Sequence, residues 1–324
     1  MENTENLSSE DESLLLQSLE QQDNWDGLPM SKFQGFWCPV FVLHPLLCFQ
    51  RNFKALDTDV LLASVPKSGT TWLKALLFSI VSRDRFPIDQ SPLLATNSHR
   101  LVFSLECFYY AEDDDPDLGN LSRPRLFSTH LPHQALPSSL IESNCKIVYV
   151  CRNPLDQFIS EREFLLKNRL WPDKPYGEVL SLDEAFDMFC DGVQAFGPFW
   201  DHLLGYWNAS LENPDRVLFL KYEDIKRDPL LKVKKIAEFV GLPFSEEEEK
   251  EGLVGDISRL CSFEKLKDLD INKNGIHFGS VKNNSLFRKG DIGDWQNYLT
   301  PAMAERMKTT LKAKLSGSGL ILDI

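Results

Sequence analysis

The sequence lacks the features that mark secreted, membrane-spanning or metal-stabilised proteins. No C-x-x-C pair occurs and the number of cysteines is odd, which favours reduced intracellular thiols over a disulfide framework or a zinc site. The most apolar early stretch, residues 36–49, contains two prolines and is too short to cross a bilayer. Residues 1–26 are acidic and polar, unlike a signal or transit peptide. We expect a soluble, cytoplasmic protein that uses neither a metal nor a membrane partner.

Basic residues and linker-like stretches are also scarce. The net charge of −13 disfavours general nucleic-acid binding, because a phosphate backbone would meet an unfavourable field. No stretch rich in Pro, Gly and Ser divides the interior of the chain. With 324 residues, 43% of them hydrophobic, the chain can bury one large core. We predict a variable, mobile N-terminal segment over residues 1–30 and a single domain over residues 31–322.

Four short apolar runs are the main structural signal that is present. They cover residues 60–65, 125–130, 146–151 and 217–222 and predict buried strands. Helical spacing of apolar residues follows the first run, and a second helix is predicted over residues 229–240. Strands that are apolar throughout and alternate with helices indicate a parallel sheet covered on both faces. The expected fold is therefore a single α/β domain with a central parallel sheet and a P-loop-like nucleotide-binding arrangement.

Polar residues stand at the ends of all four predicted strands. Lys67 follows the first strand, and His130 ends the second. Arg152 follows the third strand, and Tyr222 ends the fourth. In parallel sheets, ligands bind at the carboxyl ends of the strands. The four side chains therefore predict a binding site at this edge.

The turn after the first strand has the composition of a phosphate-binding loop. It reads Pro66-Lys-Ser-Gly-Thr-Thr-Trp72 and leads directly into a helix. Gly69 lets the backbone approach a ligand, and the first N–H groups of the helix can surround an oxyanion. Lys67 precedes the glycine by two residues, unlike the nucleotide-triphosphatase pattern in which Lys follows the last Gly. A plain Ser/Thr helix cap is the structural alternative.

A second basic segment lies near the C-terminus. Residues 272–285 are rich in Asn, Gly and Lys without periodicity, and they lead into Arg288-Lys-Gly-Asp-Ile-Gly-Asp-Trp295. An irregular segment that ends in two cations is typical of a lid over an anion. We predict a lid loop over about residues 265–290.

Together, these segments resemble the cytosolic sulfotransferases, most closely those of plants. The likeness lies in residues 66–72, Thr129-His-Leu-Pro132, Arg152-Asn-Pro with Ser160, and Arg288–Trp295, and it extends over roughly residues 30–322. It implies an enzyme that transfers a sulfuryl group from 3′-phosphoadenosine-5′-phosphosulfate (PAPS) to a hydroxyl of a small organic acceptor, without a metal.

The resemblance assigns two catalytic residues. Lys67 would hold the bridging oxygen and the 5′-phosphate, where a fixed ammonium group stabilises the charge that develops on the leaving phosphate. His130 would act as the general base that removes the acceptor hydroxyl proton, a role suited to a neutral imidazole. His133 is a weaker rival for this role, and a satisfied core histidine is the structural alternative for His130.

The remaining assignments concern the binding of PAPS. Ser68, Gly69, Thr70 and Thr71 complete the 5′-phosphate loop, while Arg152 and Ser160 would bind the 3′-phosphate, since an Arg fork suits a phosphate dianion. Arg288, Lys289 and Gly290 would close on the same phosphate from the lid. Trp72 and Phe263 would stack on adenine, with Tyr222 touching the base.

The chain departs from the family pattern at several positions. Ser128 stands where animal relatives often have Lys, and Glu161-Arg-Glu-Phe164 replaces an aromatic-His pair. Gln296 and Pro301 replace two residues of the animal dimer motif, so we expect a monomer. Flavonoids or other phenols, hydroxyjasmonates, brassinosteroids and desulfoglucosinolates are the acceptor classes considered. A P-loop small-molecule kinase and a non-catalytic protein that binds 3′,5′-ADP (PAP) or a hormone are the alternative functions.

Overall fold

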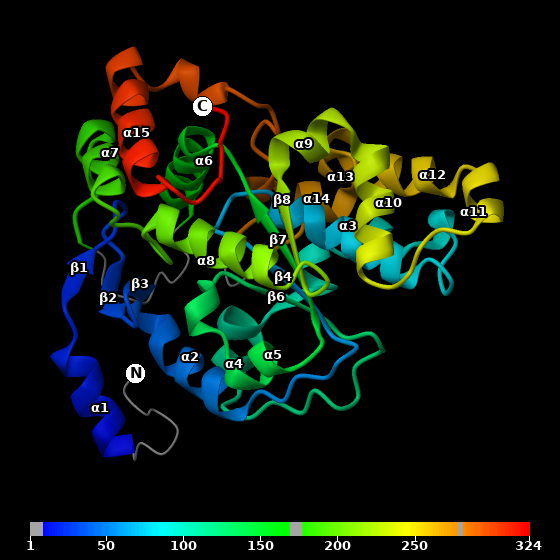
Figure 1. Ribbon diagram of the computed structural model, residues 1–324, viewed down its shortest axis with the longest axis horizontal. Helices are drawn as coiled ribbons and strands as arrows, with labels where there is room; N and C mark the ends of the chain where they lie inside the picture. The colour runs from blue at the N-terminus through cyan, green and yellow to red at the C-terminus, as the bar shows by residue number, and fades with distance from the viewer. Residues whose placement is uncertain (1–8, 169–176, 278–280) are drawn as a thin grey trace.

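A five-stranded parallel sheet forms the centre of the structure, a computed structural model that describes residues 9–168, 177–277 and 281–324 (Figure 1). The strand order is β5-β6-β4-β7-β8, and every neighbouring pair is parallel. The strands are β5 (Phe103–Ser104), β6 (Leu126–Thr129), β4 (Val60–Ala63), β7 (Lys146–Cys151) and β8 (Val217–Lys221). The four predicted strands and the α/β fold are confirmed. The two-residue edge strand β5 was not predicted, because it is too short to show a periodicity.

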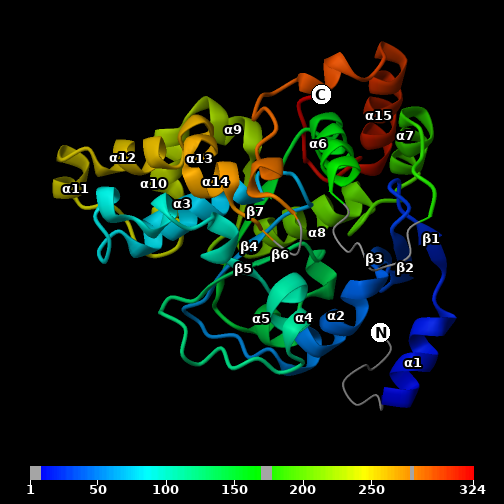
Figure 2. The same ribbon diagram turned by 180° about the vertical axis from the view of Figure 1, so that it is seen from behind.

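Helices cover both faces of the sheet (Figures 1 and 2). They are α1 (Ser9–Ser18), α2 (Val40–Asn52), α3 (Thr70–Ser82), α4 (Tyr110–Glu112), α5 (Ser138–Glu142), α6 (Pro154–Lys167), α7 (Leu182–Cys190), α8 (Phe199–Glu212), α9 (Tyr222–Arg227), α10 (Pro229–Phe239), α11 (Glu246–Lys250), α12 (Leu253–Leu260), α13 (Phe263–Asp268), α14 (Asp270–Asn274) and α15 (Pro301–Lys314). Both predicted helices are present, as α3 and α10.

Alternate residues of the central strands belong to two separate hydrophobic cores, one on each face of the sheet. Val60 and Leu62 of β4 pack with α3, α10 and α12, whereas Leu61 and Ala63 belong to the larger core that includes α2, α6 and α8. Successive strand side chains point to opposite faces of a sheet, so a strand buried on both sides must be apolar throughout. This is the physical reason for the uninterrupted apolar runs in the sequence.

A small antiparallel sheet precedes the main one. Its strands are β1 (Gln21–Asp23), β2 (Pro29–Phe33) and β3 (Phe36–Pro39), in that order. Just before β2, Trp25 is buried against Phe158 and Phe189 and donates a hydrogen bond to the Val193 carbonyl. The division of the chain at residue 31 stays a prediction, and the packed region includes residues on its N-terminal side.

The part of the chain expected to form a lid contains helices. α13 and α14 occupy residues 263–274, and a 3-10 turn follows at Asn283–Leu286. The buried side chain of Asn272 accepts a hydrogen bond from Asn97, which ties this region to the chain after α3. Residues 278–280 of the expected lid lie outside the described part. Closure of this region over an anion stays a prediction.

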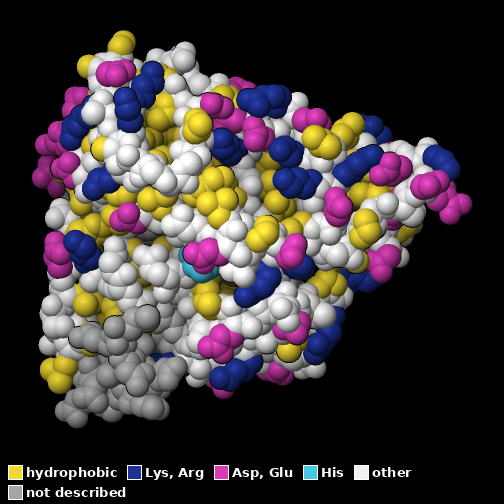
Figure 3. Space-filling view, in the orientation of Figure 1, with side chains coloured by type: hydrophobic (Ala, Val, Ile, Leu, Met, Phe, Trp, Pro, Cys, Tyr) yellow, Lys and Arg dark blue, Asp and Glu magenta, His cyan; other side chains and the backbone are white. Residues whose placement is uncertain are grey.

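The surface shows charges of both signs (Figure 3). Acidic side chains cluster at the tip where Figure 1 places α11, the helix that carries Glu246–Glu249. Among the described residues, no helix has the length and apolar character needed to cross a membrane.

Candidate active site

A single pocket at the carboxyl end of the parallel sheet takes in nearly all of the predicted site residues. The predicted residues that line it are Lys67, Gly69, Thr70, Thr71, Trp72, His130, Arg152, Ser160, Tyr222, Phe263, Arg288, Lys289 and Gly290. Ser68 is fully buried and does not line the pocket. Residues as distant in sequence as Lys67 and Gly290 thus line one pocket, and the groups that follow β4, β6, β7 and β8 meet because parallel strands bring their carboxyl ends to one edge.

The loop between β4 and α3 has the backbone of an anion-binding turn. Lys67 and Gly69 both have positive φ, at 65° and 111°, and α3 begins at Thr70. A Cβ atom at Gly69 would lie 2.8 Å from the Tyr222 ring, so only glycine fits here. The Thr70 and Ser64 hydroxyls are hydrogen-bonded at 2.7 Å, which fixes the first turn of the helix. The free N–H groups of this turn can bind a phosphate.

Lys67 reaches into the pocket from this loop. Its Nζ atom lies 4.2 Å from the centre of the Phe164 ring. Burial, together with the Arg152 and Arg288 cations, lowers the pKa of Lys67 to about 7, while Glu161 opposes the shift. A bound phosphate would favour the charged form, because an opposite charge at close range raises the pKa of an amine.

His130 is held in one tautomer. Ala63 and Thr129 are in register on β4 and β6, so Ser64 and His130 leave the sheet side by side. The His130 Nδ1 atom lies 2.8 Å from the Ser64 carbonyl oxygen, which can only accept, so Nδ1 must carry the proton. Burial lowers the pKa of His130 below its ordinary value. The neutral ring therefore presents an Nε2 lone pair, which has no hydrogen-bond partner among the described residues.

Two neighbouring groups fix the backbone of His130. The carboxylate of Glu106, which is fully buried, accepts a hydrogen bond from the His130 N–H at 2.8 Å. The His202 Nε2 atom donates to the His130 carbonyl at 3.0 Å, and its Nδ1 contacts the Tyr149 hydroxyl. The Glu106 carboxylate also raises the pKa of His130 and partly offsets the effect of burial.

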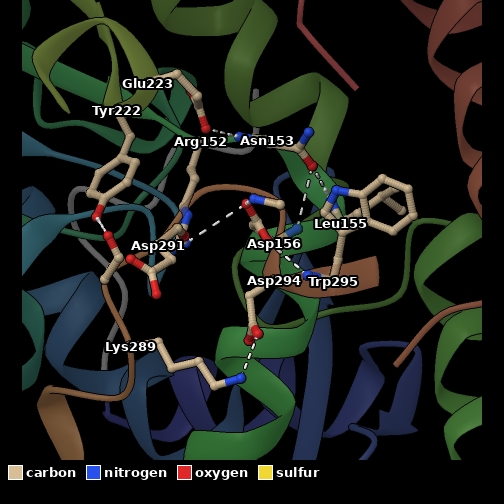
Figure 4. A network of polar contacts seen from close by, with 12 residues as sticks. Arg152, Asn153, Leu155, Asp156, Tyr222, Glu223, Lys289, Asp291, Asp294 and Trp295 are labelled. Atoms are coloured by element: carbon tan, nitrogen blue, oxygen red, sulfur yellow. Dashed lines mark hydrogen bonds and ion pairs between the residues drawn. The ribbon is translucent and has the colours of Figure 1, made fainter. Parts of the chain in front are cut away.

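Arg152 is the centre of a network between β7, α6 and the C-terminal segment (Figure 4). Its Nη2 atom donates to the Asp291 carbonyl at 2.6 Å and lies 3.8 Å from the Asp156 carboxylate. The guanidinium group stacks 4.6 Å from the centre of the Tyr222 ring. Asp156 in turn accepts from the Gly293 backbone N–H. These contacts hold Arg152 in one orientation at the pocket wall.

Arg288 and Lys289, the two cations of the basic segment, are paired with one carboxylate. Arg288 forms an ion pair with Asp294, and the Lys289 Nζ atom lies 2.6 Å from the same group. Burial would raise the pKa of Asp294, but the hydrogen bonds from Lys289, Arg288 and Asn297 outweigh it and lower the pKa to about 2. Asp294 thus connects three side chains of the basic segment.

Several buried donors in the pocket region lack a protein acceptor. The Ser68 hydroxyl, the Nε atoms of Arg152 and Arg288, and the Trp72 indole N–H are buried and have no hydrogen-bond partner within the described part of the chain. Buried polar groups are normally satisfied, so orphaned donors near a concave site point to a ligand that accepts hydrogen bonds. Two of these donors belong to arginines, whose guanidinium groups suit an anion such as a phosphate.

Comparison with known proteins decides the family. Residues 57–319 match the sulfotransferase domain. The chain belongs to the sulfotransferase family. Cytosolic sulfotransferase 15 of Arabidopsis thaliana is 46% identical, over 98% of this chain and 89% of the relative. Cytosolic sulfotransferase 6 of the same plant is 45% identical, over 96% of this chain and 95% of its own length.

Solved structures agree with this assignment. An Arabidopsis thaliana sulphotransferase is similar with a TM-score of 0.76 and 39% identity, over 98% of this chain and 99% of that one. A mouse sulfotransferase complexed with PAP has a TM-score of 0.67 and 27% identity, over 90% of this chain and 96% of that one. The predicted family and fold are therefore confirmed, and the kinase alternative is disfavoured.

The sulfotransferase pocket has an apolar part of its lining, here called the apolar compartment, in which the Phe196 ring lies 5.7 Å from the His130 ring. Its walls include five phenylalanines, Phe41, Phe103, Phe108, Phe164 and Phe196. Glu161 also lines it, and its carboxylate accepts hydrogen bonds from Gln157 at 2.6 Å and Gln194 at 3.1 Å. Burial raises the pKa of Glu161 to about 8. The departure noted at residues 161–164 therefore places a carboxyl group in the wall of the pocket.

The sequence reasoning missed two residues that line the sulfotransferase pocket and one residue that contacts the His130 backbone. Lys74 and His99 line the pocket, and Glu106 lies beneath His130. A lysine among the apolar positions of α3 was the one available signal. His133, the rival base, does not line the pocket and packs edge-on against Tyr206.

One group of potential metal ligands lies elsewhere. In the described residues, ligand atoms of His44, Cys48 and Asp114 lie within 4.8 Å of one another, outside the sulfotransferase pocket. His44 and Asp114 already form an exposed ion pair at 2.9 Å. The expectation that catalysis uses no metal stays a prediction.

Proposed function

We propose that this sulfotransferase uses His130 as general base and Lys67 as the cation that stabilises the leaving phosphate, and moves the sulfuryl group of PAPS to a hydroxyl of a small organic acceptor. The enzyme class follows from the family. One observation carries the assignment of roles: the His130 Nδ1–H is donated to the Ser64 carbonyl, which leaves the Nε2 lone pair in the same pocket as Lys67.

The proposed transfer is a direct displacement at sulfur. His130 Nε2 accepts the hydroxyl proton while the acceptor oxygen bonds to sulfur, and the bond between sulfur and the 5′-phosphate oxygen breaks. The electron pair of that bond stays on the phosphate oxygen, where the Lys67 ammonium group and the N–H groups of the first α3 turn stabilise it. The products are a sulfated acceptor, protonated His130 and PAP, and loss of the proton to solvent restores the base.

The other predicted residues would bind PAPS. Arg152, Ser160, Arg288, Lys289 and Gly290 would surround the 3′-phosphate. The orphaned Nε atoms of Arg152 and Arg288 are consistent with this role. The Trp72 and Tyr222 rings are 5.5 Å apart and Phe263 lines the same pocket, so the three can form an adenine site.

The apolar compartment favours a flat or apolar acceptor. Phenylalanine side chains bind such molecules through area burial and ring contacts. Flavonoids or other phenols, hydroxyjasmonates, brassinosteroids and desulfoglucosinolates carry hydroxyls on frameworks of this kind. We propose that the acceptor is a small plant metabolite of one of these classes, and we expect one copy of the chain to be sufficient for turnover.

A transfer assay tests the proposal. With labelled PAPS and a panel of these acceptors, we expect transfer of label to at least one acceptor. His130→Ala should lower kcat by about 10²–10⁴-fold, the usual contribution of a general base, while PAP still binds. His133→Ala is the matched control and should remain active. Near-normal turnover of His130→Ala would refute the role of His130.

The remaining alternative is a non-catalytic PAP or hormone binder. It would be favoured if the wild-type protein bound PAP tightly but transferred label to none of the acceptors. Phosphoryl transfer from ATP with magnesium would instead revive the kinase hypothesis.

A further inference from the structure

A chain of polar contacts connects α3 with the segment that follows it. The Lys74 Nζ atom lies 3.1 Å from His99 Nδ1, and the His99 Nε2 atom lies 2.9 Å from the Thr71 hydroxyl oxygen. Lys74 is one helical turn beyond Thr71 on the same face of α3. All three residues line the active-site pocket.

The chemistry of the three groups sets the direction of both hydrogen bonds. In its ammonium form Lys74 can only donate, so it then donates to His99 Nδ1. Burial and the neighbouring Lys74 keep the pKa of His99 well below its ordinary range, so the ring is neutral and has one N–H. That proton must be on Nε2, and His99 therefore donates to the Thr71 oxygen. Burial lowers the pKa of Lys74 to about 7, while the nearby Glu106 carboxylate favours its ammonium form.

The direction of these hydrogen bonds determines whether the Thr71 hydroxyl can donate to a ligand. Its oxygen accepts from His99, so its own hydroxyl proton remains available, and it has no second hydrogen-bond partner among the described residues. Thr71 is in the first turn of α3, beside the N–H groups of the phosphate loop. The hydroxyl can therefore donate to an oxyanion in this loop.

The surroundings hold His99 in place. The Asn97 side chain accepts a hydrogen bond from the His99 N–H at 2.9 Å, and the Ser98 hydroxyl donates to the Thr71 carbonyl at 3.0 Å. The His277 ring packs edge-on against His99, with centroids 4.5 Å apart. These contacts hold the backbone around His99 and pack one ring against its imidazole.

We propose that Lys74, His99 and Thr71 form a directed hydrogen-bond chain that keeps the Thr71 hydroxyl proton available to the 5′-phosphate of PAPS. His99 is then a positioning residue for the leaving group. This inference rests on the proposed function, because it takes the loop at residues 66–72 to hold the 5′-phosphate.

The proposed hydrogen-bond chain is tested by measuring the affinities for PAP and 3′-AMP by calorimetry. His99→Phe keeps a flat ring but has no N–H, and it should weaken PAP about three- to tenfold, the factor of one ordinary hydrogen bond. The affinity for 3′-AMP, which lacks the 5′-phosphate, should stay unchanged. His99→Gln can accept from Lys74 and donate to Thr71, so it should restore most of the PAP affinity. His133→Phe is the matched control and should bind PAP as the wild type does.

A double-mutant cycle separates this role from a general structural one. Thr71→Val removes the hydroxyl, so adding His99→Phe to it should change PAP affinity less than twofold. The inference is overturned if His99→Phe weakens PAP equally in both backgrounds, weakens 3′-AMP as much as PAP, or leaves PAP affinity unchanged.

Two further outcomes are distinguishable. If His99→Phe does not fold, His99→Asn, whose side chain is too short to reach both partners, takes its place in the cycle. If the wild-type protein itself does not bind PAP, the proposed function fails together with this inference; if only the cycle fails, the proposed function stands.

Discussion

Hydrogen bonds to single residues select the protonation states on which the proposed chemistry depends. The Ser64 carbonyl places the His130 proton on Nδ1, and Lys74 places the His99 proton on Nε2. Burial lowers the pKa of Lys67 to about 7, so a bound phosphate can decide its charge. Such states depend on neighbours that are distant in sequence, and the residue types alone do not reveal them.

The pH dependence of turnover should report on His130. A general base must be unprotonated, so kcat/KM should fall as the pH drops through the pKa of His130, which burial lowers below about 6.5. Glu106→Gln keeps an acceptor for the His130 N–H but removes the negative charge that raises this pKa. We expect the acid limb of the pH profile to move to lower pH in this variant. The control is Glu142→Gln, at an exposed position on α5, in which the acid limb should not move. If the acid limb of Glu106→Gln stayed at the wild-type pH, the assignment of His130 as general base would be contradicted.

Arg152 should distinguish PAP from 5′-AMP. Arg152→Ala removes a charged donor from the proposed 3′-phosphate site and should weaken PAP by about 10- to 100-fold, the range for a hydrogen bond to a charged group. The affinity for 5′-AMP, which lacks that phosphate, should change far less. Arg162→Ala, which does not line the pocket, serves as the control. Competition binding measures the affinities for PAP and 5′-AMP. Equal losses of affinity for the two nucleotides would exclude a 3′-phosphate role for Arg152.

At the scale of elements, two tight backbone approaches shape the nucleotide site. Gly69 lies against the ring of Tyr222, and Gly290 lies against Phe263, where a Cβ atom would stand 2.6 Å from the ring. The Tyr222 hydroxyl donates to the Gly290 carbonyl at 2.8 Å. The absence of a side chain at Gly69 and Gly290 thus lets the loop at residues 66–72 and the basic segment pack closely against Tyr222 and Phe263.

Gly290→Ala and Gly241→Ala form a matched pair. Both residues have positive φ, at 73° and 78°, but a Cβ atom at Gly241 would meet nothing within 4 Å. Each substitution should cost about 1–2 kcal/mol of unfolding free energy in urea, because a side chain is disfavoured in the left-handed region. Only Gly290→Ala should also weaken PAP, since it must displace Phe263. Equal PAP affinities in the two variants would show that the Phe263 contact has no part in binding.

On the scale of the whole molecule, the parallel sheet sets what can meet at the active site. Its strand ends bring together groups from β4, β6, β7 and β8, and the two cores hold the sheet between helix layers. At the opposite edge, a buried ion pair connects neighbouring strands: Arg125 Nη2 lies 2.5 Å from an Asp59 carboxylate oxygen, and Arg125 Nε lies 2.8 Å from the other.

Loss of this ion pair should affect stability but not nucleotide binding. Arg125→Met leaves the buried Asp59 carboxylate without its partner and should lower the unfolding free energy by about 3–5 kcal/mol. Arg85→Met, which removes an ion pair of 3.9 Å with the exposed Asp84, should cost no more than about 1 kcal/mol. Urea unfolding measures both, and PAP affinity of the folded variants should match the wild type. A small effect at Arg125 would mean that Asp59 finds another partner.

Local sequence was sufficient for the central strands, for two helices and for the chemical groups that line the pocket. Buried strands must be apolar, a phosphate loop needs glycine, and a basic segment followed by Gly-Asp-Trp is recognisable without a structure. The four central strands, α3, α10 and the sulfotransferase family were therefore predictable. β5 and the antiparallel sheet over residues 21–39 were not, because β5 has only two residues and the polar residues of β1 and β2 interrupt the apolar run that marks the central strands.

Only the tertiary structure decided which groups face one another. Glu106 contacts the His130 backbone from 24 positions away, and Lys74 meets His99 across 25. The sequence places each residue in an element, but strand register and helix packing set distances between elements. Hydrogen-bond direction and pKa depend on those distances within a few ångströms, so the tautomer of His130 and the chain from Lys74 to Thr71 follow from the fold.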